Sequence, residues 1–173
     1  MKQFYQNAIL QGADQITTAL GFVEKNLTRN PDDLRAKAYK GALLAMLGIT
    51  TDPKKRDIYV EGGIRILKEV NSLLSPKTPD YVEILFVVTT ALGWLAHSYP
   101  SADFNPTQLD HLIEVLDFNT LSIFEMVYTL VLASKLAEES GEISKKRNLM
   151  KRARALDLGL ALKIKALLSC HSA

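Results

Sequence analysis

Residues 39–48 read YKGALLAMLG, and residues 63–70, in the next helical stretch, read GIRILKEV. Gly41, Gly62 and Gly63 stand inside segments whose other residues favour a helix. A glycine in a helix interior costs roughly 1 kcal/mol relative to alanine, so another interaction must offset it. Close approach of two helices is the common reason, and a kink at Gly62 and Gly63 without any packing role is the alternative. The glycines therefore predict a tightly packed helix pair.

Helical signals extend over the rest of the chain. The sequence Asn30-Pro31-Asp32-Asp33 is typical of a helix start, because asparagine caps, proline fits the first turn and acids complement the helix dipole. Thr78-Pro79-Asp80 and Asn105-Pro106 repeat the pattern. No segment alternates with a two-residue period between hairpin turns, so strands are not expected. We predict an all-α protein with helices at about 3–11, 14–28, 31–47, 56–74, 79–98, 106–117, 120–139 and 142–168.

The length and charge of the chain bound its class. At 173 residues, 47% of them hydrophobic and 23% charged, it can bury a core as a single domain covering residues 1–173. The net charge of +2 gives no chain-wide case for nucleic-acid binding. The charge is uneven, however, because residues 142–173 hold 8 Lys and Arg against 2 Asp and Glu. The basic excess therefore belongs to the C-terminal segment.

The cellular location is predicted from three features that the sequence lacks. Cys170 is the single cysteine, so no intrachain disulfide can form and a reducing compartment fits best. The first residues, MKQFYQNAILQGADQ, lack the apolar run of a signal peptide. The most apolar stretch, residues 84–96, is 13 residues long, whereas a membrane span needs about 20. We expect a buried core helix there and a cytoplasmic protein.

Internal repetition favours one helical architecture. Gly41, Leu44, Leu47 and Gly48, followed by Gly63, Leu67, Val70 and Pro76, resemble one tetratricopeptide (TPR) repeat. A second match has Ser134, Ala137 and Gly141 in its first helix and Lys146, Met150 and Ala153 in its second, and a partial match has Ala19, Val23 and Asn26 before Pro31. The resemblance implies a right-handed array of antiparallel hairpins with units 1–31, 32–76, 79–118 and 119–157 and a C-terminal helix extension at 158–170. In this register Gly48 ends a helix and ten extra residues precede Gly63. A generic helical bundle is the alternative.

The residues that could carry chemistry form no recognised motif. His97, His111 and His171 belong to no metal-binding pattern. Asp110, Glu114 and Asp117 share a helix face beside His111, but a solvated outer face explains them equally well. Phosphate-loop, dinucleotide-binding and hydrolase motifs do not occur. We therefore predict no catalytic residue, no metal and no cofactor.

The TPR resemblance implies a protein-binding groove. Its groove-facing residues would be Arg35, Tyr39, Ala42, Met46, Tyr128, Leu132, Lys135 and Glu139. Such a mixture is enriched where peptides dock, and it predicts a non-catalytic scaffold, chaperone or adaptor that binds a peptide or helix of another protein. In the alternative interpretation later helices cover these residues. A helical bundle that binds a small apolar ligand, or an accessory subunit of an enzyme, is the rival function.

The basic C-terminal segment gives two further expectations. Arg147, Lys151 and Arg154 share one helix face, which is either solvated or able to touch RNA, acidic lipid or an acidic partner. The segment has no aromatic residue to stack bases, so nucleic acid is not expected. Leu158 and Leu162 add apolar surface off the main stripe of the predicted last helix. We predict self-association through them as a two-fold dimer, in preference to folding back into the groove.

Overall fold

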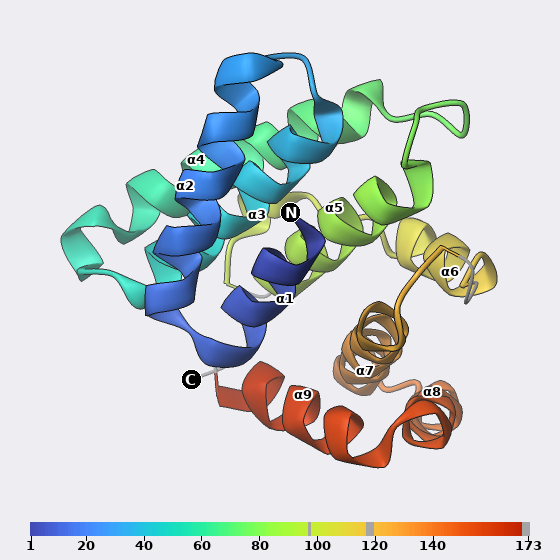
Figure 1. The fold of residues 1–173 in the computed structure, drawn as a ribbon. Coiled ribbons are helices and arrows are strands. Elements are labelled where there is room, and N and C mark those ends of the chain that lie inside the picture. Colours follow the sequence, from blue (N-terminus) through green and yellow to red (C-terminus); the bar gives the residue numbers. More distant parts are fainter. Residues whose placement is uncertain (97, 117–119, 171–173) are drawn as a thin grey trace. The chain divides into compact units, whose positions relative to one another are not determined.

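The computed structural model describes residues 1–96, 98–116 and 120–170, and every regular element within them is helical (Figure 1). The all-α prediction is confirmed. The elements are α1 (Lys2–Gln11), α2 (Ala13–Arg29), α3 (Leu34–Thr50), α4 (Pro53–Leu73), α5 (Tyr81–Leu95), the short 3₁₀ helix η1 (Pro100–Ala102), α6 (Pro106–Glu114), α7 (Ile123–Glu139), α8 (Ile143–Leu156) and α9 (Leu158–Cys170). The chain forms two compact units, unit 1 (Met1–Leu92) and unit 2 (Gly93–Ala173).

Unit 1 is built from α1 to α4 and most of α5. Each of the first three helices packs against the next, so the predicted pairs at 1–31 and 32–76 are present as α1 with α2 and α3 with α4. The extra residues between Gly48 and Gly63 are mostly helical, because α4 already starts at Pro53. The Asp52 carboxylate accepts a hydrogen bond from the Lys54 N–H at 2.9 Å, which caps that start.

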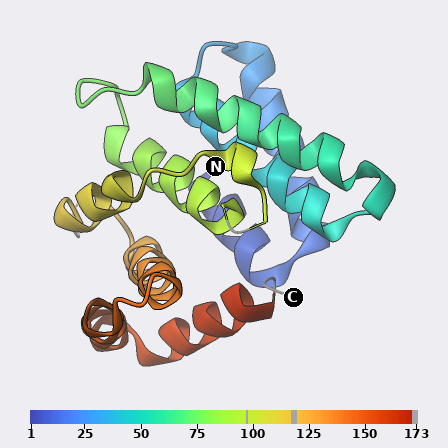
Figure 2. The ribbon, with the colours of Figure 1, turned by 180° about the vertical axis from the view of Figure 1, so that it is seen from behind.

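α3 and α4, which Figure 2 shows from behind, pack so closely that some of their glycines have no room for a Cβ atom. A Cβ atom on Gly63 would lie 2.5 Å from the Gly41 carbonyl oxygen and 2.8 Å from the Ala45 nitrogen. A Cβ on Gly41 would lie 2.9 Å from Leu67 Cγ. The predicted tight helix pair is therefore confirmed for Gly41 and Gly63. For Gly62 it is wrong, because no atom of the described residues lies within 4 Å of a Cβ added there.

Gly48 does not end its helix, contrary to what the TPR register implied. α3 continues to Thr50. A Cβ on Gly48 would lie 2.6 Å from Val60 Cγ2 and 2.8 Å from the Arg56 carbonyl oxygen. Because Gly41 meets Leu67 and Gly48 meets Val60, the two helices run antiparallel. Gly48 is a second point of close approach along the same helix pair.

The apolar stretch at 84–96 forms most of α5, in which Ile84, Phe86 and Val88 are buried. It is a core helix, as predicted. Within residues 1–96, 98–116 and 120–170, no helix combines the length and the apolar character that a membrane span requires.

Unit 2 is arranged around α7, which packs against α6, α8 and α9. Ser122 and Glu125 start α7 with a capping box, in which each side chain bonds to the backbone N–H of the other residue. Gly141, with φ +77°, ends it, and the Glu142 N–H donates to the Ala137 carbonyl at 2.7 Å. This tight turn returns the chain antiparallel along α7 as α8. The predicted hairpin within 119–157 is therefore present.

The last predicted helix, 142–168, is wrong as a single element. The backbone at Asp157 is extended, with φ −159° and ψ 108°, so α8 stops at Leu156. The Asp157 carboxylate accepts a hydrogen bond from the Leu160 N–H at 2.9 Å and so caps a new helix, α9. Figure 1 shows α9 turning away from the axis of α8. Because of this break, α9 packs on both α7 and α8.

Candidate functional site

The first half of the predicted groove lies on α3, in unit 1, and its tyrosine is part of the core. Tyr39 is 1% exposed and packs edge-on against Tyr5, with ring centroids 5.1 Å apart. Its hydroxyl donates to Glu83 Oε1 at 2.5 Å, and Arg35 Nε donates to the same oxygen at 2.8 Å. Burial lowers the pKa of Arg35, but attraction and hydrogen bonding to Glu83 outweigh it and raise the pKa. Met46 on the same helix is half-buried.

The second half lies on α7, in unit 2. Tyr128 is 7% exposed, Leu132 is buried, and burial raises the pKa of the Tyr128 phenol. Lys135 Nζ donates to the Leu168 carbonyl at 2.8 Å and lies 3.9 Å from a Glu139 oxygen. For Tyr39, Tyr128 and Leu132, burial favours the interpretation in which other helices cover the predicted groove, whereas Glu139 is exposed. Neither tyrosine is accessible to a partner.

The carboxylate face around His111 is engaged in ion pairing. Asp110 Oδ1 lies 3.0 Å from Lys145 Nζ, and a hydrogen bond from Lys145 to Asp110 raises the pKa of the lysine. Asp117, His97 and His171 lie outside the described residues. Within the described part of the chain, no group of three or more His, Cys, Asp or Glu residues could hold a metal ion.

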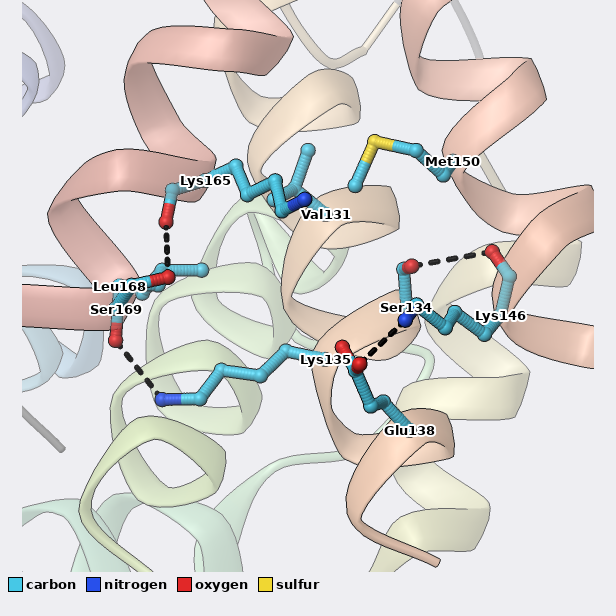
Figure 3. Close-up of a pocket in the computed structure, with 9 residues that line it drawn as sticks. All are labelled: Val131, Ser134, Lys135, Glu138, Lys146, Met150, Lys165, Leu168 and Ser169. Atoms are coloured by element: carbon cyan, nitrogen blue, oxygen red, sulfur yellow. Dashed lines mark hydrogen bonds and ion pairs between the residues drawn. The ribbon is translucent and has the colours of Figure 1, made fainter. Parts of the chain in front are cut away.

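A small cleft opens among α7, α8 and α9 in unit 2 (Figure 3). Its polar groups largely bond to one another. Ser134 Oγ donates to the Lys146 carbonyl at 3.1 Å, Ser169 Oγ donates to the Lys165 carbonyl at 2.9 Å, and Lys146 Nζ bonds to Glu138. The hydrogen bond from Lys146 lowers the pKa of Glu138. The volume is about 40 Å³, enough for a few waters and far too small for a cofactor.

A second and larger hollow lies between α8 and α9, and cations line it. We call it the basic groove, an open hollow of about 320 Å³ lined by Lys146, Arg147, Met150, Lys151, Arg154 and Lys165. Five of these six residues are cationic and none is acidic. The structure thus brings together Arg147, Lys151 and Arg154, which the sequence placed on one face, and adds Lys146 and Lys165.

Most of the cations in the basic groove lack an ion pair with the residues that the structure describes, although Lys165, after the larger effect of Lys146, also lowers the pKa of Glu138. Lys146 pairs with Glu138. The other four cations, Arg147, Lys151, Arg154 and Lys165, make no ion pair with any residue in the described part of the chain. Sequence reasoning missed Lys165, because a continuous last helix would carry it away from α8. The signal that could have found it is Asp157, a good capping residue, three positions before Leu160.

Comparison of the chain with known protein families, with characterised proteins and with solved structures found no match.

Proposed function

We propose that the protein is a non-catalytic protein-binding module and that the basic groove is its contact surface. One observation carries the proposal, namely four cations that gather around one hollow and have no ion pair among the residues that the structure describes. Like charges at short spacing repel one another and destabilise a fold. An isolated protein gains nothing from such an arrangement, whereas the acidic groups of a partner would offset the repulsion.

The rival functions have less support. The small cleft has only about 40 Å³ and polar walls, and cations line the basic groove, so neither hollow suits a small apolar ligand. The packed helix pairs at 1–31, 32–76 and 119–157 are compatible with a TPR-like array, which we retain as a proposal together with a cytoplasmic location. The proposed array and the proposed contact surface together support an adaptor or scaffold role.

Site-specific cross-linking tests the proposed contact surface. A photo-reactive amino acid is placed at position 154, which lines the basic groove, or at position 152, which is exposed on the same helix outside it. Each protein is illuminated in lysate of the native cell, and cross-linked peptides are identified by mass spectrometry. We expect a defined protein partner from position 154 and none from position 152. The same products from both positions, or none from either, would show that the groove is not the contact surface.

Self-association through α9 is a second candidate, carried by two exposed leucines. Leu158 is 57% exposed and Leu162 is 48% exposed. Full burial of a leucine contributes about 2 kcal/mol, so a two-fold contact that covered both in each copy could be stable. Light scattering on the intact protein and on L158E/L162E tests this, because an intact monomer excludes the dimer. We rank it second, since the contact would also bring together Lys163 and Lys165 of both copies.

A further inference from the structure

The exposed leucines of α9 lie on the same helix face as the basic groove. Leu158, Leu162, Lys165 and Ser169 are spaced i, i+4, i+7 and i+11, which places them on one stripe of the helix. Lys165 lines both the basic groove and the small cleft, and Ser169 lines the cleft. The stripe therefore continues the wall of the basic groove towards the start of α9 as apolar surface.

The facing wall on α8 has the same mixed character. Ile143, Arg147, Met150 and Arg154 are also spaced i, i+4, i+7 and i+11. Ile143 is 46% exposed and Met150 is half-buried within the groove lining. Each wall thus combines cations with exposed aliphatic side chains. Single exposed apolar side chains are common on protein surfaces, but here Ile143, Leu158 and Leu162 lie on the same helix faces as the cations of the groove.

We propose that the basic groove binds an acidic amphipathic segment of another protein. Carboxylates of the segment pair with Arg147, Lys151, Arg154 and Lys165, and its apolar side chains cover Leu158 and Leu162. The inference rests on the proposed protein-binding function and names the chemistry of the partner. Charge complementarity sets the sign of the segment, and the leucine stripe requires apolar residues at helical spacing.

The same observations disfavour other occupants. Nucleic acid is disfavoured because the groove lining contains no aromatic side chain on which a base could stack. A phosphate backbone also has no apolar surface that could cover Leu158 and Leu162. A membrane surface cannot enter a hollow between two helices. A second copy would present its own cations. Binding of RNA and of lipid vesicles is therefore measured beside binding of the acidic peptide.

The first measurement is fluorescence anisotropy of the intact chain with a labelled peptide that repeats Glu-Glu-Leu-Leu. Matched peptides replace every Glu with Gln, or every Leu with Ala. We expect each replacement to weaken binding by about tenfold or more, because the charge and the apolar contact are both required. We also expect the affinity of the acidic peptide to fall as salt rises.

The second measurement compares variants on the same helices. R154E and K165E reverse charges that line the groove, whereas R152E and K163E reverse exposed charges outside its lining. We expect a loss of about tenfold or more in affinity for the acidic peptide from the first pair and less than about twofold from the second. L158S/L162S should weaken binding similarly, whereas L73S, a change at a comparably exposed leucine of α4, should not.

The proposal is overturned if the Gln peptide binds as tightly as the Glu peptide, or if R152E weakens binding as much as R154E. It is also overturned if an oligouridine RNA or vesicles with phosphatidylserine bind more tightly than the acidic peptide and lose binding in R154E. A partner cross-linked from position 154 through a segment without acidic residues would leave the proposed function standing and refute this inference alone.

Discussion

The contact between α3 and α4 gives a sharp test of the packing, because two adjacent glycines of α4 have opposite surroundings. The changes are G63A and its matched control G62A. A Cβ on Gly63 would meet the Gly41 carbonyl oxygen at 2.5 Å and the Ala45 nitrogen at 2.8 Å, whereas a Cβ on Gly62 meets no atom of the described residues within 4 Å. Both positions are helical, so both changes carry the same intrinsic gain in helix propensity.

That shared gain is about 1 kcal/mol, and it should appear almost unopposed in G62A. In G63A the clashing atoms belong to the backbone of α3, so no side chain can rotate away and the two helices must separate. Overpacking of this kind costs about 1–3 kcal/mol, and the upper part of that range applies to backbone contacts. We therefore expect G63A to be less stable than G62A by about 2–3 kcal/mol in free energy of unfolding.

Urea denaturation followed by circular dichroism measures this difference, and hydrogen exchange of the α3 and α4 amides locates it within unit 1. G41A should fall between the two, since part of its clash is with the side chains of Leu67 and Ile66, which can move. If G63A proves as stable as G62A, the close approach of the two helices is wrong and so is the reason given for the glycines.

Three smaller tests address other contacts. Y39F removes a hydrogen-bond donor to the buried Glu83 and should lower the free energy of unfolding by about 1–3 kcal/mol, as measured by urea titration. The same change should cost less in an E83Q background. An equal cost in both backgrounds would contradict the hydrogen bond. Because Lys146 lowers the folded-state pKa of Glu138, this carboxylate stabilises the fold above its unfolded pKa near 4.5 and loses that contribution as the pH falls through the folded value. E138Q should therefore be less stable than the parent at neutral pH and equally stable in strong acid, a pattern that urea titrations over a pH series would reveal or exclude. D157A should cost about 1 kcal/mol by removing the cap of α9 while D157N costs little, and chemical shifts that become helical through residue 157 in D157A would show that the cap keeps the helices apart.

The existence of the helices could be predicted because their signals are local. Asn105 caps α6 and Pro106 begins it, as predicted. The start of α3 was predicted three residues too early, because Asp33 and not Asn30 caps this helix, which begins at Leu34. Which face of a helix is closely packed depends instead on the neighbouring helix, which the local sequence does not specify. Gly62 and Gly63 are adjacent and chemically identical, and only the position of α3 makes one of them necessary.

Burial of the predicted groove residues could not be predicted for a similar reason. The hydroxyl of Tyr39 meets a carboxylate 44 positions away in the sequence, and nothing near Tyr39 indicates that Glu83 lies within hydrogen-bonding distance. A buried tyrosine with a satisfied hydroxyl and an exposed one in a groove have the same local pattern. The TPR register predicted that Tyr39 faces a groove, but it carried no information on the residues around that side chain.

The basic groove shows how one local feature decides whether a charged stripe becomes a candidate site. The sequence predicts the stripe of Arg147, Lys151 and Arg154, and such stripes are mostly solvated faces. Asp157 interrupts the helix, so that α9 packs beside α8 and places Lys165 opposite the stripe. The charges then gather around one open hollow, where the exposed cations Arg147, Lys151, Arg154 and Lys165 repel one another. A partner that brings carboxylates into this hollow relieves the repulsion, and R154E should relieve part of it without a partner. R154E should therefore be at least as stable as the parent in low salt while binding the acidic peptide less tightly, an opposite change in stability and affinity that a merely structural arginine would not produce.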